Sequence, residues 1–85
     1  MEKEKIKQQI YNYTVIFEPA KEGGYTVYAP ALQGCITQGD TFEEAETMIK
    51  DAIQGYLKVV KDLKEEIPIE SEKTIISRVP IKLSF

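Results

Sequence analysis

Few side chains in this sequence are able to do covalent chemistry, and those that are lack the partners that they need. Cys35 is the only cysteine of the 85 residues, and the sequence has no histidine. A nucleophilic thiol or hydroxyl normally needs an adjacent base, and zinc normally needs several thiolate or imidazole ligands. We therefore predict that Cys35 is a small apolar residue of a short strand, and that Ser71, Ser77 and Ser84 are not nucleophiles.

Carboxylates are the remaining reactive groups, because metal-dependent ribonucleases gather several of them around two metal ions. The strand-like segments of this sequence have apolar centres such as Val15 and Val27 and contain no aspartate. Four acidic residues lie at a strand end or in the first turns of an expected helix: Glu18, Asp40, Glu43 and Glu46. Solvated charges that favour the positive end of a helix dipole account for them. We predict no enzymatic activity, no metal and no cofactor.

Length and composition are those of one small domain, residues 1–85, that starts with a polar segment, residues 1–9. Hydrophobic residues make up 42% and charged residues 29%, which separates the chain from disordered proteins. The 14 acidic and 11 basic residues give a formal charge of −3. We therefore expect a basic protein as the partner and do not expect nucleic acid. The sequence shows no secretory leader and no apolar run of the roughly 20 residues that span a membrane. We expect a cytoplasmic protein.

Alternating apolar residues predict three strands in the first half of the chain. The first covers about residues 10–18 and is joined to the second, 25–29, by a short loop with two glycines, which predicts an antiparallel hairpin. A third, short strand is predicted at 35–38. Four tyrosines lie on the first two strands: Tyr11, Tyr13, Tyr25 and Tyr28. They form either cross-strand pairs or a stacking platform for single-stranded nucleic acid, and the acidic balance favours the first interpretation.

A long amphipathic helix is predicted from Phe42 to about Glu66, before Pro68. Thr41 and Glu44 have the spacing of a capping box, in which each side chain bonds the backbone at the start of the helix. Apolar residues recur at intervals of three and four: Phe42, Ala45, Ile49, Ala52, Tyr56, Val60 and Leu63. Such a stripe is the face that packs on a sheet.

The helix is predicted to be longer than the sheet that it covers. Its end, near residues 59–67, should extend beyond the strands and need another surface, such as the N-terminal segment or a second subunit. Gly55, inside the helix, is interpreted as a site of close packing or of a slight bend. Residues 67–73 are expected to be a linker to a final strand, Thr74–Val79, which Pro80 interrupts. The prediction is a β-β-β-α-β order in an α+β fold, with one long helix on one face of a small, mainly antiparallel sheet.

The segment from Gly24 to Ala45 resembles the HicB family of antitoxins. Members show a GGY strand, a proline-leucine-x-glycine-cysteine loop, and a glutamine-glycine-aspartate-threonine sequence that opens a helix. The matching residues, whose roles we take as mainly structural, are Gly24, Tyr25, Pro30, Gly34, Cys35, Gln38, Gly39, Asp40, Thr41 and Glu44. Gly24 is expected to take a positive φ, and Gly34 and Gly39 to let the third strand turn tightly at both ends.

The resemblance implies a truncated ribonuclease-H-like fold and a partner, a small basic HicA-type toxin that cleaves mRNA and whose active site the antitoxin masks. Many members also carry a C-terminal DNA-binding module that represses their own operon. Here the sequence ends at Phe85 after one more strand pattern, so we do not expect that module or that activity in this chain.

Two functions stay open. The first is an antitoxin that binds and masks a HicA-like toxin; the second is an orphan HicB-like module that oligomerises and has no toxin partner. In both, the sheet face away from the helix, with Ile16, Tyr28 and Ile76, is expected to be free for another protein, and self-association as a dimer or larger homo-oligomer is expected. The candidate partner-binding residues are Tyr28, Leu32, Glu43 and Glu46.

Overall fold

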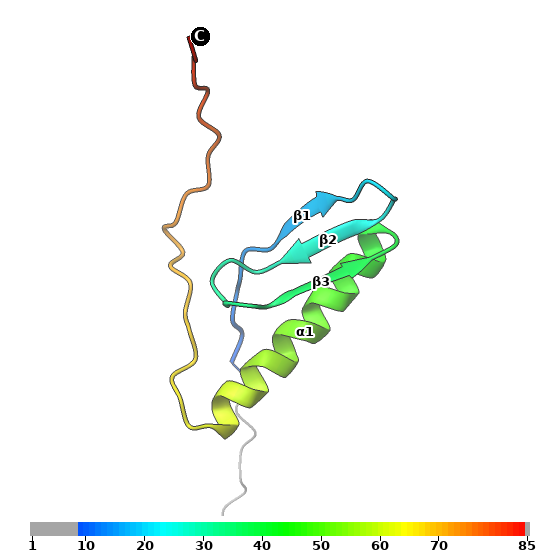
Figure 1. Cartoon of the computed structure of the whole chain (residues 1–85). Helices are drawn as coiled ribbons and strands as arrows, with labels where there is room; N and C mark the ends of the chain where they lie inside the picture. Colours follow the sequence, from blue (N-terminus) through cyan, green and yellow to red (C-terminus); the bar gives the residue numbers. More distant parts are fainter. Residues whose placement is uncertain (1–8, 85) are drawn as a thin grey trace, which may run out of the picture.

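Three short antiparallel strands followed by one helix form the folded body of the protein (Figure 1). The structure is a computed structural model, and it describes residues 9–84. The strands β1 (Ile16–Pro19), β2 (Tyr25–Tyr28) and β3 (Ile36–Gly39) lie in the order β1-β2-β3, and the helix α1 (Phe42–Asp62) packs on one face of the sheet. This arrangement confirms the predicted α+β class. The predicted polar segment, residues 1–9, lies outside the described residues except for Gln9.

The register of the strands decides which side chains meet the helix. Phe17, Val27 and Thr37 are cross-strand partners on the helix side, where Val27 is fully buried. β1 is shorter than predicted, because β2 ends at Tyr28, the partner of Ile16, and no strand formed by the described residues lies beside residues 10–15. The helix contacts β2 and β3 and leaves β1 the least covered strand.

The core of the described residues is small and includes part of a loop. Its buried side chains are Val27, Ala29, Leu32, Cys35, Ala45 and Ile49. The loop after β2 folds inward because the N–H of Leu32 donates to the Ala29 carbonyl at 3.0 Å and the N–H of Cys35 donates to the Leu32 carbonyl at 3.0 Å. Leu32 therefore lies beneath the helix at 1% exposure.

Gly39 allows the helix to lie directly on the sheet. A Cβ atom at this position would stand 2.5 Å from the backbone nitrogen of Ala45 and 2.7 Å from its Cα atom. β3 ends at Gly39 and the chain bends at the next two residues, as predicted. The φ of Gly39 is not in the left-handed region, so the need for glycine here comes from the close approach of the helix backbone. Gly24 does take the predicted positive φ, at 76°.

Side-chain hydrogen bonds define the start of the helix, and a left-handed backbone conformation defines its end. The Thr41 side chain accepts from the Glu44 N–H at 3.0 Å, and the Glu44 carboxylate accepts from the Asp40 N–H at 2.6 Å, so the predicted capping interaction is present. At the other end, Lys64 takes φ 60° and its N–H donates to the Lys61 carbonyl. This left-handed residue ends the helix at Asp62, earlier than the predicted Glu66.

The C-terminal half of the helix projects beyond the strands, as predicted (Figure 1). Val59 and Leu63 remain exposed there. The chain then turns back and residues 67–70 pass the segment that precedes β1. The Thr14 N–H donates to one Glu70 carboxylate oxygen at 2.8 Å, and the Thr14 hydroxyl donates to the other. This contact, which no sequence pattern predicted, joins the two ends of the folded body.

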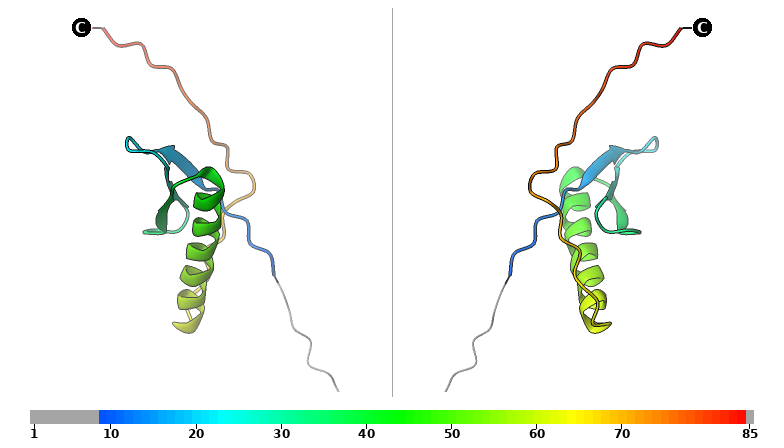
Figure 2. Two further views of the ribbon diagram at one scale, coloured as in Figure 1. Left: turned by 90° about the vertical axis from the view of Figure 1, so that its right-hand side faces the viewer. Right: turned by 90° about the vertical axis from the view of Figure 1, so that its left-hand side faces the viewer.

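The predicted final strand is wrong for the single chain. Residues 74–79 are extended, but no strand pairs with them among residues 9–84, and every residue from 71 to 84 is exposed. Both perpendicular views show this tail leaving the body and ending far from the sheet (Figure 2). An alternating sequence becomes a strand only where a neighbouring strand can accept its hydrogen bonds, and this chain places none beside the tail.

Two glycine-to-alanine substitutions should change stability in opposite directions. Gly39→Ala places a methyl group against the helix backbone and should destabilise the fold by about 1–3 kcal/mol. Gly55 has no atom within 4 Å of an added Cβ, which contradicts the predicted close packing, so Gly55→Ala should stabilise the helix by about 1 kcal/mol. Urea denaturation at one fixed protein concentration measures both, and equal effects would contradict the close contact at Gly39.

The acid titration of Glu70 should report the Thr14 contact. The two hydrogen bonds from Thr14 lower the pKa of Glu70 below its ordinary 4.5. The contact therefore stabilises the fold above pH 4.5, and this contribution is lost as the pH falls through the lowered pKa. Thr14→Val removes the hydroxyl donor and should raise the Glu70 pKa towards 4.5, as measured by carboxyl carbon NMR. An unchanged titration in the variant would show that the contact does not form.

Candidate functional site

The sheet face away from the helix is a candidate protein-binding surface. Ile16, Tyr28 and Ile36 are cross-strand partners in one row of this face, and Ile36 is 59% exposed. We call these three residues the open face. The Tyr28 hydroxyl donates to Glu18 at 3.4 Å, and desolvation and that carboxylate raise the pKa of Tyr28. The row is an apolar strip with one hydroxyl at its centre, a composition typical of protein contact rather than of catalysis.

A hollow of about 530 Å³ adjoins the open face. Thr14 and Ile16 form one side of it, and the start of the C-terminal tail, including Ile76, forms the other. The loop residues Pro30 and Ala31 close its end. Ile76 lines this hollow together with Ile16 but belongs to no strand of the sheet and stays exposed, so the prediction that it lies on the sheet face away from the helix is not confirmed.

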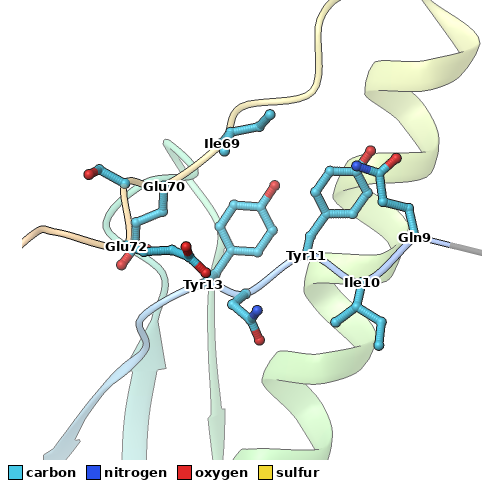
Figure 3. A pocket seen from close by; sticks show the side chains of 9 residues that line it. Gln9, Ile10, Tyr11, Tyr13, Ile69, Glu70 and Glu72 are labelled. Atoms are coloured by element: carbon cyan, nitrogen blue, oxygen red, sulfur yellow. The ribbon is translucent and has the colours of Figure 1, made fainter.

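The four tyrosines do not form one platform. Tyr11 and Tyr13 stack with ring centroids 6.5 Å apart, and the Tyr13 hydroxyl donates to the Pro68 carbonyl. Figure 3 shows both rings on the same side of their segment, with Ile69 and Glu70 beside Tyr13. Tyr25 instead meets Phe42 edge to face, at 6.1 Å, on the helix side, and Tyr28 lies on the open face. No two of the four tyrosines are cross-strand partners, because Tyr25 pairs with Pro19 and Gly39, and Tyr28 pairs with Ile16 and Ile36.

The small hollow drawn in Figure 3 is structural. It has about 330 Å³ and lies between residues 9–13 and residues 69–72. Burial, and then the neighbouring Tyr11 and Glu70, raise the pKa of Tyr13, so this hydroxyl stays protonated as a donor to Pro68. The hollow follows from the chain's return past its own N-terminal segment.

The residues that carry the family resemblance lie in turns, at the helix start or in the core. Gly24 and Gly34 have positive φ, at 76° and 82°. Cys35 is buried, and burial raises the pKa of its thiol, which disfavours the thiolate that a nucleophile needs. Pro30, Gln38 and Asp40 are exposed beside these turns. Their placement supports the structural roles proposed for the group.

The four candidate partner-binding residues are not brought together. Tyr28 lies on the open face, whereas Glu43 and Glu46 are exposed on the first turns of α1, on the other side of the sheet. Leu32 is 1% exposed in the core, so we keep the partner-binding prediction only for the other three. The structure thus separates an apolar surface from an acidic one.

A second apolar surface was missed from the sequence. A groove of about 490 Å³ runs between residues 9–15 and the helix, and its apolar walls are Tyr13, Val15, Ile49, Ile53 and Leu57. We call it the helix groove. The signal in the sequence was the width of the helical stripe, because Ile53 and Leu57 make the apolar face broader than three short strands can cover.

The described part of the chain contains neither a metal-binding cluster nor a membrane-spanning helix. No three or more carboxylate, thiol or imidazole side chains of residues 9–84 lie close enough together to share a metal ion. Among helices of the same residues, none combines the length and the apolar character that crossing a membrane requires.

Comparison with known proteins gives one consistent result. The family model described as "HicB_like antitoxin of bacterial toxin-antitoxin system" matches residues 13–80. A UPF0150 protein of Synechocystis is 43% identical over 74 residues, which cover 87% of this chain and 91% of the relative. A UPF0150 protein of Thermoplasma acidophilum is 44% identical over 63 residues, 74% of this chain and 91% of the relative.

One similar protein is named for its function. Antitoxin HicB 1 of Photorhabdus laumondii is 42% identical over 57 residues, which are 67% of this chain and 37% of that longer protein. The matched range of the family model contains β1 to β3, the whole of α1 and the start of the tail. With this match over most of the sequence, the chain belongs to the HicB-like antitoxin family of bacterial toxin-antitoxin systems.

Proposed function

We propose that this protein is a type II antitoxin that binds a HicA-type, mRNA-cleaving toxin and masks its active site. The observation that carries the proposal is the match of the antitoxin family model over residues 13–80. The family supplies the antitoxin role, and the identity of the toxin class is the step that we add. A non-enzymatic mode of action belongs to the proposal, because an antitoxin that covers a site needs area and affinity and no reactive group.

Charge gives the proposed complex its attraction. Glu43, Glu44 and Glu46 are exposed in the first turns of α1, and the chain as a whole carries a formal charge of −3. A toxin that holds RNA needs a positive surface for the phosphates. An acidic surface accelerates encounter with such a protein and competes with the RNA for the same groups.

The open face gives the proposed complex its apolar area. Stable interfaces have a well-packed apolar centre inside a polar rim. Ile36 and Tyr28 provide that kind of centre, and Glu18 beside them provides a polar edge. We propose that the protein acts in the cytoplasm as a homo-oligomer, and that its sheet and helix are a truncated form of the ribonuclease-H-like fold.

A second candidate function has support of its own. The two UPF0150 relatives described above are matched along 91% of their length, whereas Antitoxin HicB 1 is matched along 37%. Most of this chain thus corresponds to nearly the whole of two short relatives whose names state no toxin. An orphan HicB-like module that oligomerises without a toxin is the alternative that the experiments below separate from the first.

Co-expression tests the first function directly. The protein is expressed with the small basic protein encoded beside its gene, and the pair is passed over a size-exclusion column. We expect co-elution, and relief of the growth arrest that the basic protein causes alone. Separate elution together with unrelieved arrest would overturn the antitoxin proposal and leave the orphan module.

Charge reversal at the start of the helix tests where the toxin binds. The double variant Glu43→Lys, Glu46→Lys should bind the toxin at least tenfold more slowly, because it replaces attraction by repulsion. The double variant Glu65→Lys, Glu66→Lys makes the same charge change at two exposed residues just after the C-terminal end of α1 and serves as the control. Stopped-flow binding at low salt measures both rates, and equal slowing in the two variants would refute a specific role for the acidic helix start.

A further inference from the structure

The C-terminal tail, residues 74–84, has the pattern of a strand and no strand partner. We call these residues the arm. Its odd-numbered positions form an apolar row interrupted by Ser77, and the apolar members are exposed by 69–86%: Ile75, Val79, Ile81 and Leu83. A row of aliphatic side chains with a period of two is typical of a strand with one face buried. In the single chain nothing buries it.

The free edge of β1 offers the hydrogen bonds that the arm lacks. β1 pairs with β2 on one side only, and no strand of residues 9–84 lies on its other side. Pro80 is compatible with pairing there. In a strand, the backbone groups of even-numbered and odd-numbered residues point to opposite sides. If the odd-numbered residues bond to β1, the even-numbered residues, which include Pro80, face solvent, so the missing N–H of Pro80 costs no hydrogen bond.

The helix groove offers the apolar surface. The helix lies mainly over β2 and β3 and meets β1 where Phe42 packs on Phe17. This leaves Val15, Ile53 and Leu57 only half-buried along the groove. A strand beside β1 directs alternate side chains to the helix side of the sheet. The odd-numbered row of an arm laid there would fill the groove.

The chain's own arm does not occupy these places. Residues 68–70 are bonded to Tyr13 and Thr14, and the Thr74 N–H donates to the Ser71 carbonyl at 3.3 Å in a turn. After that turn the arm runs away from the body (Figure 2). An occupant from another molecule is therefore needed.

Charge selects a second copy of this chain as that molecule. The arm contains Arg78 and Lys82 and no acidic residue; because the whole chain carries −3 and the arm carries +2, the remainder carries −5. A basic arm suits the acidic body of a second copy. It does not suit a basic toxin, for which the like charges would repel.

We propose that two copies exchange arms, each arm pairing with the free edge of β1 of the other copy and burying its odd-numbered row in the helix groove. The exchange uses the same two surfaces in both directions, so it closes as a symmetric dimer. The inference rests on the self-association in the proposed function and is independent of the toxin.

Amide hydrogen exchange of the full-length protein, combined with its mass in solution by light scattering, tests the proposal without any partner. We expect a mass of twice one chain, and amides of the odd-numbered residues from 75 to 83 that exchange at least tenfold more slowly than those of an unstructured peptide of the same sequence. A dimer with fast-exchanging arms would overturn arm exchange and leave self-association by another surface. A monomer would overturn both, whether its arm is free or folded back.

Charge-matched variants identify the face of the arm that is buried. Ile81→Asp alters the apolar row and should weaken the dimer at least tenfold, by sedimentation at several concentrations. Ser84→Asp adds the same charge in the even-numbered row and should change dimerisation less than twofold. Equal effects of the two variants would overturn the proposed orientation, and arm protection that arises only on adding the toxin would assign the arm to the toxin instead.

Discussion

The contact between the start of α1 and Gly39 of β3 is the constraint on which the rest of the structure depends. The helix backbone at Ala45 lies so close that a single Cβ on Gly39 would stand 2.5 Å from it. At that separation, small side chains suffice to fill the space between helix and sheet, and the core of the described residues contains Ala29, Cys35 and Ala45. A core of this size stabilises a short body only and cannot extend under the whole helix.

The position of the helix also determines which surfaces remain uncovered. Because α1 lies over β2 and β3, the edge of β1 and the helix groove stay open, and because the helix occupies one face, the row of Ile16, Tyr28 and Ile36 stays open on the other. The described residues thus leave three surfaces incomplete. Surfaces of this kind suit association with another protein, which agrees with the antitoxin family to which the chain belongs.

Much of this could be predicted from the sequence, for identifiable physical reasons. The alternation of side chains along a strand predicted that Tyr28 and Ile16 lie on the face of the sheet away from Val27. The Thr41 and Glu44 side chains predicted where the helix starts. Both predictions succeed because each depends on residues only a few positions apart in the sequence. The end of the helix depends on Lys64 adopting a left-handed conformation, which its residue type does not favour. Leu32 was misplaced because its loop bends inward through backbone hydrogen bonds. The last strand was predicted from a real alternation whose partner this single chain does not supply.

The proposed inactivation of a toxin by covering it is tested most directly by mRNA cleavage by the purified HicA-type toxin while the purified chain is added. Cleavage should fall in proportion to the chain added and be abolished when every toxin molecule is bound. Cleavage that continues at its starting rate with the chain in large excess would contradict the proposal.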